Sequence, residues 1–119
     1  MSGIDRDINP DPRQSLTNRH LPNTAQAQRL LRSEGRAHVF NDRETLERVT
    51  QAIIVGGEQT GVDDEEDAYE RYGLYFSEQI GYIIRVDDRQ TPLYYGEIKI
   101  VKTTGDYHAI PCTSPRRTS

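Results

Sequence analysis

The sequence is poor in cysteine and in long apolar runs, and both shortages narrow what the protein can be. Cys112 is the only cysteine among 119 residues, which excludes an intrachain disulfide and a zinc site built from several cysteines. The longest strongly apolar run is the segment 52–55, which is too short for a membrane span or for the apolar core of a secretion signal. We therefore expect a cytoplasmic protein that does not contact a membrane.

Hydrophobic residues are also scarce, at 34% of the chain with a mean hydropathy of −0.82. A composition this polar indicates that part of the chain does not join a packed core. The N-terminal residues fit that description, because they combine three prolines with scattered polar residues and show no helix or strand periodicity. The sequence predicts a disordered leader over 1–24, a single domain over 25–115 and a flexible tail over 116–119.

Charge opposes a broad nucleic-acid surface. The net charge is −4, and acidic residues are concentrated in the run at 63–67. A nucleic-acid-binding domain normally carries the opposite balance. The run itself has the composition of a solvated loop or an early helix turn. An acidic domain of this kind would bind RNA only through a local basic pocket.

Two helices are predicted from residue spacing and from end signals. Residues 25–34 contain good helix formers, and Gly35 stands where a helix would stop. The stronger pattern covers 42–55, where apolar residues recur at intervals of three and four. Asn41, with Glu44 three residues later, fits a capping box at the start of this second helix.

Strand patterns follow the second helix. Clear alternation or β-branched and aromatic content marks 79–86, 93–101 and 107–111, and a short aromatic segment at 72–76 is a fourth candidate. We expect neighbouring segments to pair in turn. The register of each pair would match the two apolar faces, because a slip of one residue would turn an apolar set outward. The predicted fold class is α+β, with one main helix packed on a three- to four-stranded antiparallel β-meander.

The register of the last hairpin, at 101–106, stays open between two loops. A four-residue loop at 102–105 sets Lys99 opposite His108, whereas a three-residue loop with a bulge sets Ile100 opposite His108. The first loop is favoured because it keeps the histidine off the apolar face.

Four polar residues are candidates for a catalytic site on the sheet face that the helix leaves open. Glu97, Lys99 and His108 would lie there together, and His38 precedes the main helix, where it would join them if the helix begins at the sheet edge. Metal-independent cleavage of a phosphodiester needs a base, an acid and a cation. In this hypothesis His108 and His38 are the acid and the base, Lys99 stabilises charge, and Glu97 orients a partner or serves as an alternative base. The alternative is that these are ordinary solvated residues of a strand.

The same open face would carry Tyr95, Arg85 and Tyr75, which we expect to bind a partner or a substrate. Tyrosine is common in contact surfaces, and the chain contains seven. This favours another hypothesis, an interaction or regulatory module without catalysis, which has a protein partner and is a monomer or a weak homodimer. No histidine spacing indicates a metal site and no motif indicates a cofactor, and the third histidine, His20, lies in the predicted leader.

Three stretches resemble a set of small uncharacterised cyanobacterial proteins. The stretches read HVFNDRETLERVTQAIIVGG, YGLYFSEQIGYII and PLYYGEIKI followed by GDYHAIP, and the resemblance covers roughly residues 38–115. A looser resemblance, in architecture, is to the barnase, EndoU, colicin and RelE-like toxin ribonucleases, in which a helix precedes an antiparallel sheet. That resemblance implies RNA as the substrate, with His38, Glu97, Lys99 and His108 at the matching positions.

Overall fold

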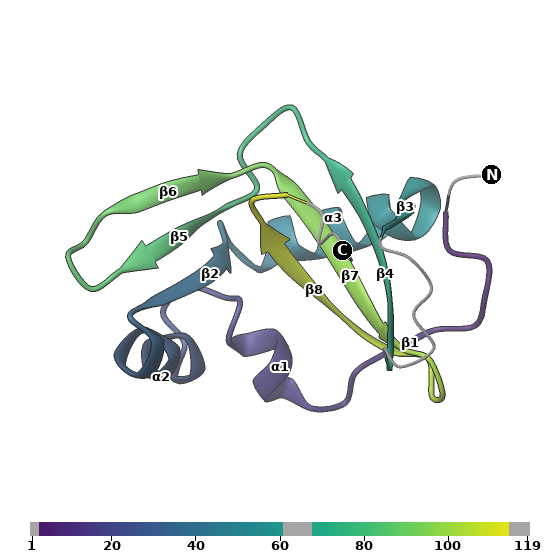
Figure 1. The fold of residues 1–119 in the computed structure, drawn as a ribbon, viewed down its shortest axis with the longest axis horizontal. Coiled ribbons are helices and arrows are strands. Elements are labelled where there is room, and N and C mark those ends of the chain that lie inside the picture. Colours follow the sequence, from purple (N-terminus) through teal and green to yellow (C-terminus); the bar gives the residue numbers. More distant parts are fainter. Residues whose placement is uncertain (1–2, 61–67, 115–119) are drawn as a thin grey trace.

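The computed structural model describes residues 3–60 and 68–114. The strands of this part are β1 Asn9–Pro10, β2 Arg36–Phe40, β3 Glu58–Thr60, β4 Tyr69–Tyr75, β5 Gly81–Arg85, β6 Gln90–Leu93, β7 Tyr95–Val101 and β8 Asp106–Cys112. The helices are α1 Gln14–Asn18, α2 Ala25–Glu34 and α3 Arg43–Gly56. The described strands form a five-stranded sheet of order β1-β8-β7-β4-β3 and a three-stranded sheet of order β2-β5-β6 (Figure 1). Each helix in this part is too short or too polar to cross a membrane.

The predicted fold class, one main helix on a three- to four-stranded meander, is wrong. β4 pairs antiparallel with β7 along its whole length, from Tyr69 opposite Val101 to Tyr75 opposite Tyr95. β5 and β6, which lie between them in the sequence, form a hairpin that pairs with β2 in the smaller sheet. The chain passes from one sheet to the other at Tyr94, and Figure 1 shows the hairpin extending away from the large sheet.

A second small core explains why the β5–β6 hairpin leaves the large sheet. Ala37 and Val39 of β2 pack against Ala27 of α2, and none of the three is more than 3% exposed. Tyr82 and Ile84 of β5 pack against this cluster from the paired strand. β2, which the sequence analysis did not assign as a strand, therefore supplies the apolar partner on which the hairpin buries its side chains.

Both predicted helices are present, but the cap of the longer one differs. α2 confirms the helix predicted over 25–34. At α3, the N-cap is Asp42, whose carboxylate accepts a hydrogen bond from the Thr45 N–H at 2.7 Å. Asn41, the predicted cap, donates its side-chain amide to the carbonyl of Gln79 instead. The cap is therefore displaced by one residue because Asn41 anchors the loop that leads to β5.

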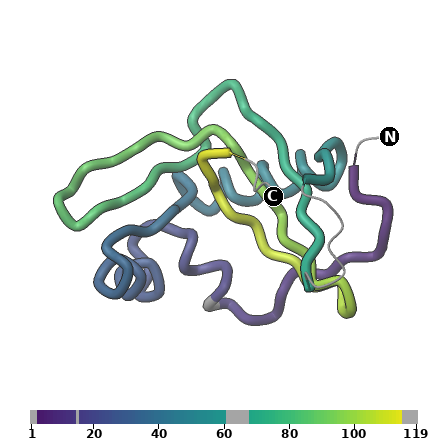
Figure 2. Tube along the Cα trace, viewed as in Figure 1, coloured from purple at the N-terminus to yellow at the C-terminus, as the bar shows by residue number. Residues whose placement is uncertain are grey.

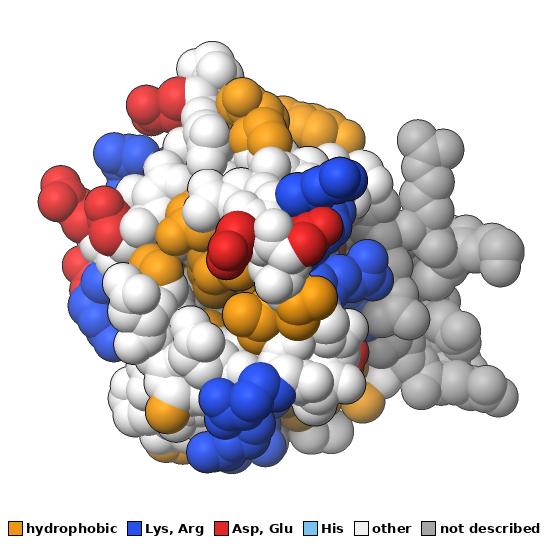
Figure 3. Space-filling model, turned by 90° about the vertical axis from the view of Figure 1, so that its left-hand side faces the viewer, with side chains coloured by type: hydrophobic (Ala, Val, Ile, Leu, Met, Phe, Trp, Pro, Cys, Tyr) orange, Lys and Arg blue, Asp and Glu red, His pale blue; other side chains and the backbone are white. Residues whose placement is uncertain are grey.

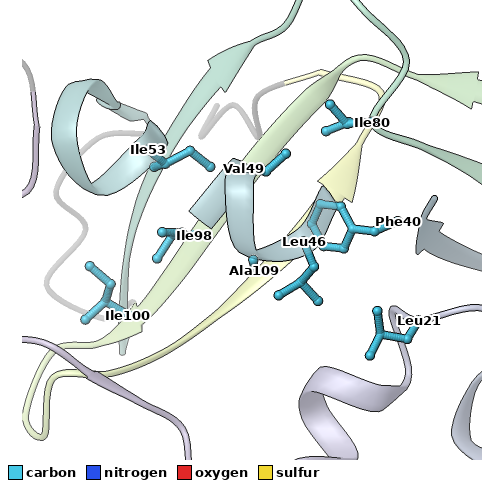
Figure 4. Close-up of a cluster of buried hydrophobic side chains, with 9 residues drawn as sticks. All are labelled: Leu21, Phe40, Leu46, Val49, Ile53, Ile80, Ile98, Ile100 and Ala109. Atoms are coloured by element: carbon cyan, nitrogen blue, oxygen red, sulfur yellow. The ribbon is translucent and has the colours of Figure 1, made fainter. Parts of the chain in front are cut away.

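α3 packs across one face of the large sheet (Figure 4). Val49 and Ile53 of the helix are fully buried in one cluster with Ile98 and Ile100 of β7. Because side chains alternate along a strand, Lys99, which lies between these two isoleucines, points to the opposite face of the sheet. The packing of α3 thus decides which face is left for polar chemistry.

The leader that the fold-class prediction treated as disordered is docked on the fold from residue 3 to residue 24. The Ile4 N–H donates to the Ile54 carbonyl at 3.0 Å, and β1 then pairs in parallel with the start of β8. Figure 2 shows the segment passing from the end of α3 beneath the large sheet to α1 and α2. Leu21 is 5% exposed within the main core. Apart from the short helix α1, the segment has little regular structure and touches the fold at separated points, so its few apolar residues show no helix or strand period.

Some predictions are left untested. The tail at 116–119 and the acidic run at 63–67 lie outside the described residues. The domain boundaries drawn at residues 24 and 115 stay predictions.

The last hairpin adopts the favoured register. β7 and β8 are joined by residues 102–105, and the Gly105 N–H donates to the Val101 carbonyl at 2.8 Å. Gly105 has a φ of 79°, a left-handed conformation that glycine adopts without a Cβ penalty. Lys99 consequently pairs with His108.

Candidate active site

The candidate site lies on the face of the large sheet opposite α3, which we call the outer face. Register and alternation place on this face Tyr69, Arg71 and Tyr75 of β4, Tyr95, Glu97 and Lys99 of β7, and His108, Ile110 and Cys112 of β8. Lys99 and His108 are directly opposite each other, because Ile98, Ile100 and Ala109 point into the core. The structure therefore brings together Glu97, Lys99, His108, Tyr95 and Tyr75 of the predicted site.

The histidine that meets His108 is His20. The two rings are nearly parallel, at 8°, and their centroids are 6.2 Å apart. His20 is 8% exposed, and its Nδ1 lies 2.9 Å from the carbonyl oxygen of His38. His20 is not among the predicted site residues, because it lies in the segment predicted to be a disordered leader. The one local hint is that it directly precedes Leu21, an apolar residue that joins the core.

The contact with the His38 carbonyl determines the tautomer of neutral His20. A carbonyl oxygen only accepts hydrogen bonds, so Nδ1 must carry the proton and donate. The lone pair of the neutral ring is then on Nε2. His20 is thus prepared as a base at Nε2, in the way that a backbone carbonyl orients many functional histidines.

Burial and neighbouring cations keep both rings neutral. Burial lowers the pKa of His20 to about 4, and the His108 ring beside it contributes in the same direction. Burial also lowers the pKa of His108 to about 4, and Lys99 and Arg19 add to the effect by repelling the imidazolium form. Arg13 lowers the pKa of His108 further, whereas the carboxylate of Asp11 raises it. Three cations, Lys99, Arg19 and Arg13, therefore lie close enough to act on the charge of His108.

Asp11 anchors Arg13 next to this cluster. The Arg13 guanidinium donates to both carboxylate oxygens, at 3.1 Å from Nε and 2.9 Å from the second nitrogen. These bonds lower the pKa of Asp11 to about 2. The Asp11 side chain is almost fully buried while that of Arg13 is 64% exposed. The arginine is thus held at the surface of the site in a fixed position.

Lys99 lies over an aromatic ring on the outer face. Its Nζ is 4.1 Å from the centroid of Tyr69, a cation–π distance. Tyr69 also lies 5.9 Å from the guanidinium carbon of Arg71. The ring therefore helps to hold the ammonium group of Lys99 in place across from His108.

Glu97 is buried and ion-paired. Its carboxylate lies 3.5 Å from Nε of Arg71, and both side chains are less than 10% exposed. Removing either partner of this buried ion pair would destabilise the fold, because the remaining charge would be buried without compensation. Glu97 thus neutralises the buried Arg71 beside Lys99 on the outer face. The orienting role suggested for Glu97 stays a prediction.

The predicted binding residues divide into two groups. Tyr75 and Tyr95 face each other across β4 and β7, with ring centroids 4.7 Å apart in an edge-to-face arrangement. Tyr95 is 2% exposed, and burial raises its pKa to about 12. Glycine at position 73 leaves room for its hydroxyl, since a Cβ there would clash with the ring. Tyr95 is therefore a packing residue, and Tyr75 is the accessible member of the pair.

His38 and Arg85 lie elsewhere, on the smaller sheet. His38 pairs with Ile83 across β2 and β5. Its pKa is lowered by burial and then by the charges of Arg36 and Arg85. Arg85 donates to the hydroxyl of Thr91 on β6. His38 contributes its backbone carbonyl to the site, through His20, while its side chain lies among the arginines.

Metal ligation and thiol chemistry have little support in this part of the molecule. Among residues 3–60 and 68–114, no group of three His, Cys, Asp or Glu side chains is arranged to hold a metal ion. Burial raises the pKa of Cys112 to about 12, so its nucleophilic thiolate form is scarce at neutral pH.

Comparison with known proteins identifies a family and no activity. A family model described as a domain of unknown function (DUF6972) matches residues 6–116. The chain belongs to this family. The match includes the N-terminal segment that carries Asp11, Arg13 and His20 as well as the strands that carry Lys99 and His108. No curated protein and no solved structure matches the chain.

Proposed function

We propose that this domain cleaves RNA by general acid–base catalysis without a metal ion. The observation that carries the proposal is the parallel pair of imidazoles of His20 and His108, whose centroids are 6.2 Å apart. Lys99 of β7 lies directly opposite His108 of β8. Two titratable rings and a cation are the groups that this reaction needs. The proposal keeps His108 and Lys99 from the sequence hypothesis and replaces the side chain of His38 with that of His20.

In the proposed reaction His20 is the base. Its Nε2 takes the proton of a ribose 2′-hydroxyl as that oxygen attacks the adjacent phosphorus. The bond from phosphorus to the 5′-oxygen of the next nucleotide breaks, and protonated His108 gives its proton to that oxygen. Lys99 stabilises the negative charge that develops on the phosphoryl oxygens. The products are a 2′,3′-cyclic phosphate and a 5′-hydroxyl, and DNA is not cleaved because it lacks the 2′-hydroxyl.

Substrate binding supplies the protonated acid. In the free protein the pKa of His108 is about 4, lowered by burial and by Lys99, Arg19 and Arg13. A bound phosphate offsets the charge of those cations and adds a negative charge near the ring. The pKa of His108 then rises, so the group becomes an acid only when an anion occupies the site.

A second candidate, an interaction module without catalysis, is favoured by the smaller sheet. β6 is an edge strand, and Val86 at the hairpin tip is 70% exposed. On the side that carries this hairpin and α2, hydrophobic, acidic and basic side chains are interspersed (Figure 3). The tyrosine surface that motivated this hypothesis is smaller than expected, because Tyr95 is buried; Tyr75 remains available for contact, at 65% exposed. In this candidate function, the protein is a monomer or a weak homodimer, and a protein partner binds at the edge strand β6.

The test of the ribonuclease proposal is cleavage of total RNA and tRNA in the presence of EDTA. Wild-type protein is expected to produce fragments ending in a cyclic phosphate, and His108→Ala and His20→Gln are expected to lose cleavage by at least about a hundredfold. His38→Gln is the matched control and should retain cleavage, because it keeps the backbone carbonyl that holds His20.

Circular dichroism establishes that each variant is folded. Absence of cleavage by wild type, or equal cleavage by wild type and folded His108→Ala, would contradict the proposal. In that case sedimentation velocity and affinity capture with a β6 hairpin variant address the interaction candidate.

A further inference from the structure

An open groove of about 310 Å³ lies along α2. Its lining residues are Arg19, Gln26, Arg29, Leu30 and Ser33. Positions 26, 29, 30 and 33 are three or four residues apart, so they share one face of the helix. Arg19 comes from the connection between α1 and α2 and directly precedes His20. The groove therefore joins a face of α2 to the segment that carries the stacked histidine.

The five lining side chains offer hydrogen-bond donors and no carboxylate. The guanidinium groups of Arg19 and Arg29 only donate, and the Gln26 amide and the Ser33 hydroxyl can donate as well. Leu30 is the apolar member of the lining and also packs against the small core of α2 and β2. A group with several negatively charged acceptor atoms fits this lining better than a neutral or cationic group does.

Neither arginine of the groove forms an ion pair within the described part of the chain. Five other arginines in that part do contact a carboxylate, namely Arg6, Arg13, Arg48, Arg71 and Arg89. The stretch 19–36 has four arginines and a single acidic residue, Glu34, although the whole chain has a net charge of −4. Figure 3 shows a group of basic side chains low on the face that carries α2. The groove therefore has a local positive charge that attracts an anion.

We propose that this groove binds the phosphate group of a small phosphomonoester, beside the stacked histidine pair and linked to it by Arg19. A phosphomonoester has three terminal oxygens that accept hydrogen bonds, and a guanidinium donates two parallel bonds to such a group. A carboxylate has only two oxygens, so it would leave part of the lining unused. The volume is at the lower end of the roughly 300–1,000 Å³ of small-molecule pockets, which leaves room for the molecule attached to the phosphate. The site does not depend on the proposed function, because binding needs no cleavage.

Arg19 is shared between the groove and the histidines. Its charge lowers the pKa of His20 and also that of His108. The other charged groups that act on His108 are Lys99, Arg13 and Asp11. A phosphate in the groove offsets the charge of Arg19, the cation that it contacts. Occupancy of the groove should therefore raise the pKa of His108 slightly.

Binding is tested with glycerol 3-phosphate, and glycerate, a carboxylate of similar size, is the comparison. Each is titrated into the ¹⁵N-labelled full chain at neutral pH. We expect glycerol 3-phosphate to shift the backbone signal of Ser33 and the side-chain signals of Gln26 and Arg29, and to bind at least about tenfold more tightly than glycerate. Arg29→Gln should weaken this binding by at least about tenfold. Arg32→Gln removes the same charge from an exposed position of α2 outside the groove, so this control should bind as wild type does.

Three results would overturn the site. They are equal binding by wild type and folded Arg29→Gln, equal binding of the two ligands, and shifts of the groove signals by uncleavable 2′-O-methyl oligouridylate at a lower concentration than by glycerol 3-phosphate. The last result would assign the groove to an RNA surface instead.

The link through Arg19 is tested in Lys99→Met, which lacks the cation directly opposite His108. Glycerol 3-phosphate should still raise the pKa of His108 in this variant, and adding Arg29→Gln should remove that rise. Binding in the groove without any change in that pKa would overturn the link. RNA cleavage is measured separately, so a failure of the catalytic proposal leaves these results unchanged.

Discussion

At the scale of residues, the main chain holds His20 at three points. Its ring contacts the His38 carbonyl, its N–H donates to the Thr17 carbonyl at 3.1 Å, and its own carbonyl accepts the Phe40 N–H at 2.9 Å. A group held in this way has little conformational freedom to lose when a substrate binds. The cost is that a buried imidazole does not protonate easily, and this has measurable consequences for pH dependence.

The first prediction concerns the titration of the two stacked rings. In ¹H–¹³C spectra of the free protein, His20 and His108 should stay neutral down to about pH 4. Inorganic phosphate should raise the pKa of His108, because it offsets Lys99 and the nearby arginines. Lys99→Met should abolish most of that phosphate effect. A pKa of His108 that does not respond to phosphate would show that no anion binds near the ring.

The second prediction concerns stability in acid. His20 has a pKa of about 4 in the folded protein against 6.5 for a free histidine, so the unfolded chain binds the extra proton between these values. Stability is therefore complete above about pH 6.5 and falls as the pH drops to 4, by up to about 3 kcal/mol for His20. Urea unfolding across this range measures the slope. His20→Gln should make the slope shallower, with His108 accounting for part of what remains, and an unchanged slope would argue that His20 is not buried as a neutral ring.

At the scale of elements, the N-terminal segment covers an otherwise open side of the large sheet. β1 pairs with the start of β8, and Leu21 packs with Phe40 and Leu46 in the main core. The segment also carries Asp11, Arg13 and His20 to the outer edge of β8. Docking of this segment thus builds half of the candidate site, so stability and function should be lost together when it is removed.

The third prediction tests that docking with a single substitution. Leu21→Ala should lower the free energy of unfolding by about 2–5 kcal/mol, the usual cost of emptying a buried leucine position. Gln28→Ala, on an exposed position of α2, is the control and should change it by no more than about 0.5 kcal/mol. Urea denaturation provides both values. Equal stability of the two variants would mean that the segment contributes nothing to the core.

At the scale of the whole molecule, a local cationic site is set in an acidic chain. The net charge is −4, yet Lys99, Arg13 and Arg19 all act on His108. The long-range field therefore does not attract RNA, and the attraction is confined to distances within the site. Under the proposed function, we therefore expect the protein to recognise a phosphate at short range and not to bind nucleic acid broadly.

The fourth prediction is a shallow salt dependence of RNA binding. Three phosphate-contacting cations give a slope of log K against log salt concentration of roughly −2 for single strands. Fluorescence anisotropy of a short RNA, with the inactive His108→Ala protein, measures this slope. Lys99→Met removes one cation, so the slope should become less steep by about 0.7. A slope steeper than about −4 would indicate phosphate contacts well beyond these three cations and would contradict the local site.

Local features of this protein are determined by its sequence, because they depend on residues that are close together along the chain. α2 has its predicted bounds, and α3 lies one residue from its predicted span. The four-residue hairpin that sets Lys99 opposite His108 follows from Gly105 and from strand alternation. The outward position of Glu97, Lys99 and His108 likewise follows from the period of a strand.

Only the tertiary structure decided which distant segments meet. No local pattern distinguishes pairing of β4 with β7 from pairing with β5, since the choice depends on the apolar cluster that β2 and α2 offer to the hairpin. The same is true of His20, which reaches His108 because a segment without periodicity pairs with the start of β8 and then turns through α1. Its few apolar residues are buried only against residues that are distant in the sequence, and burial there is the main cause of the lowered pKa of His20.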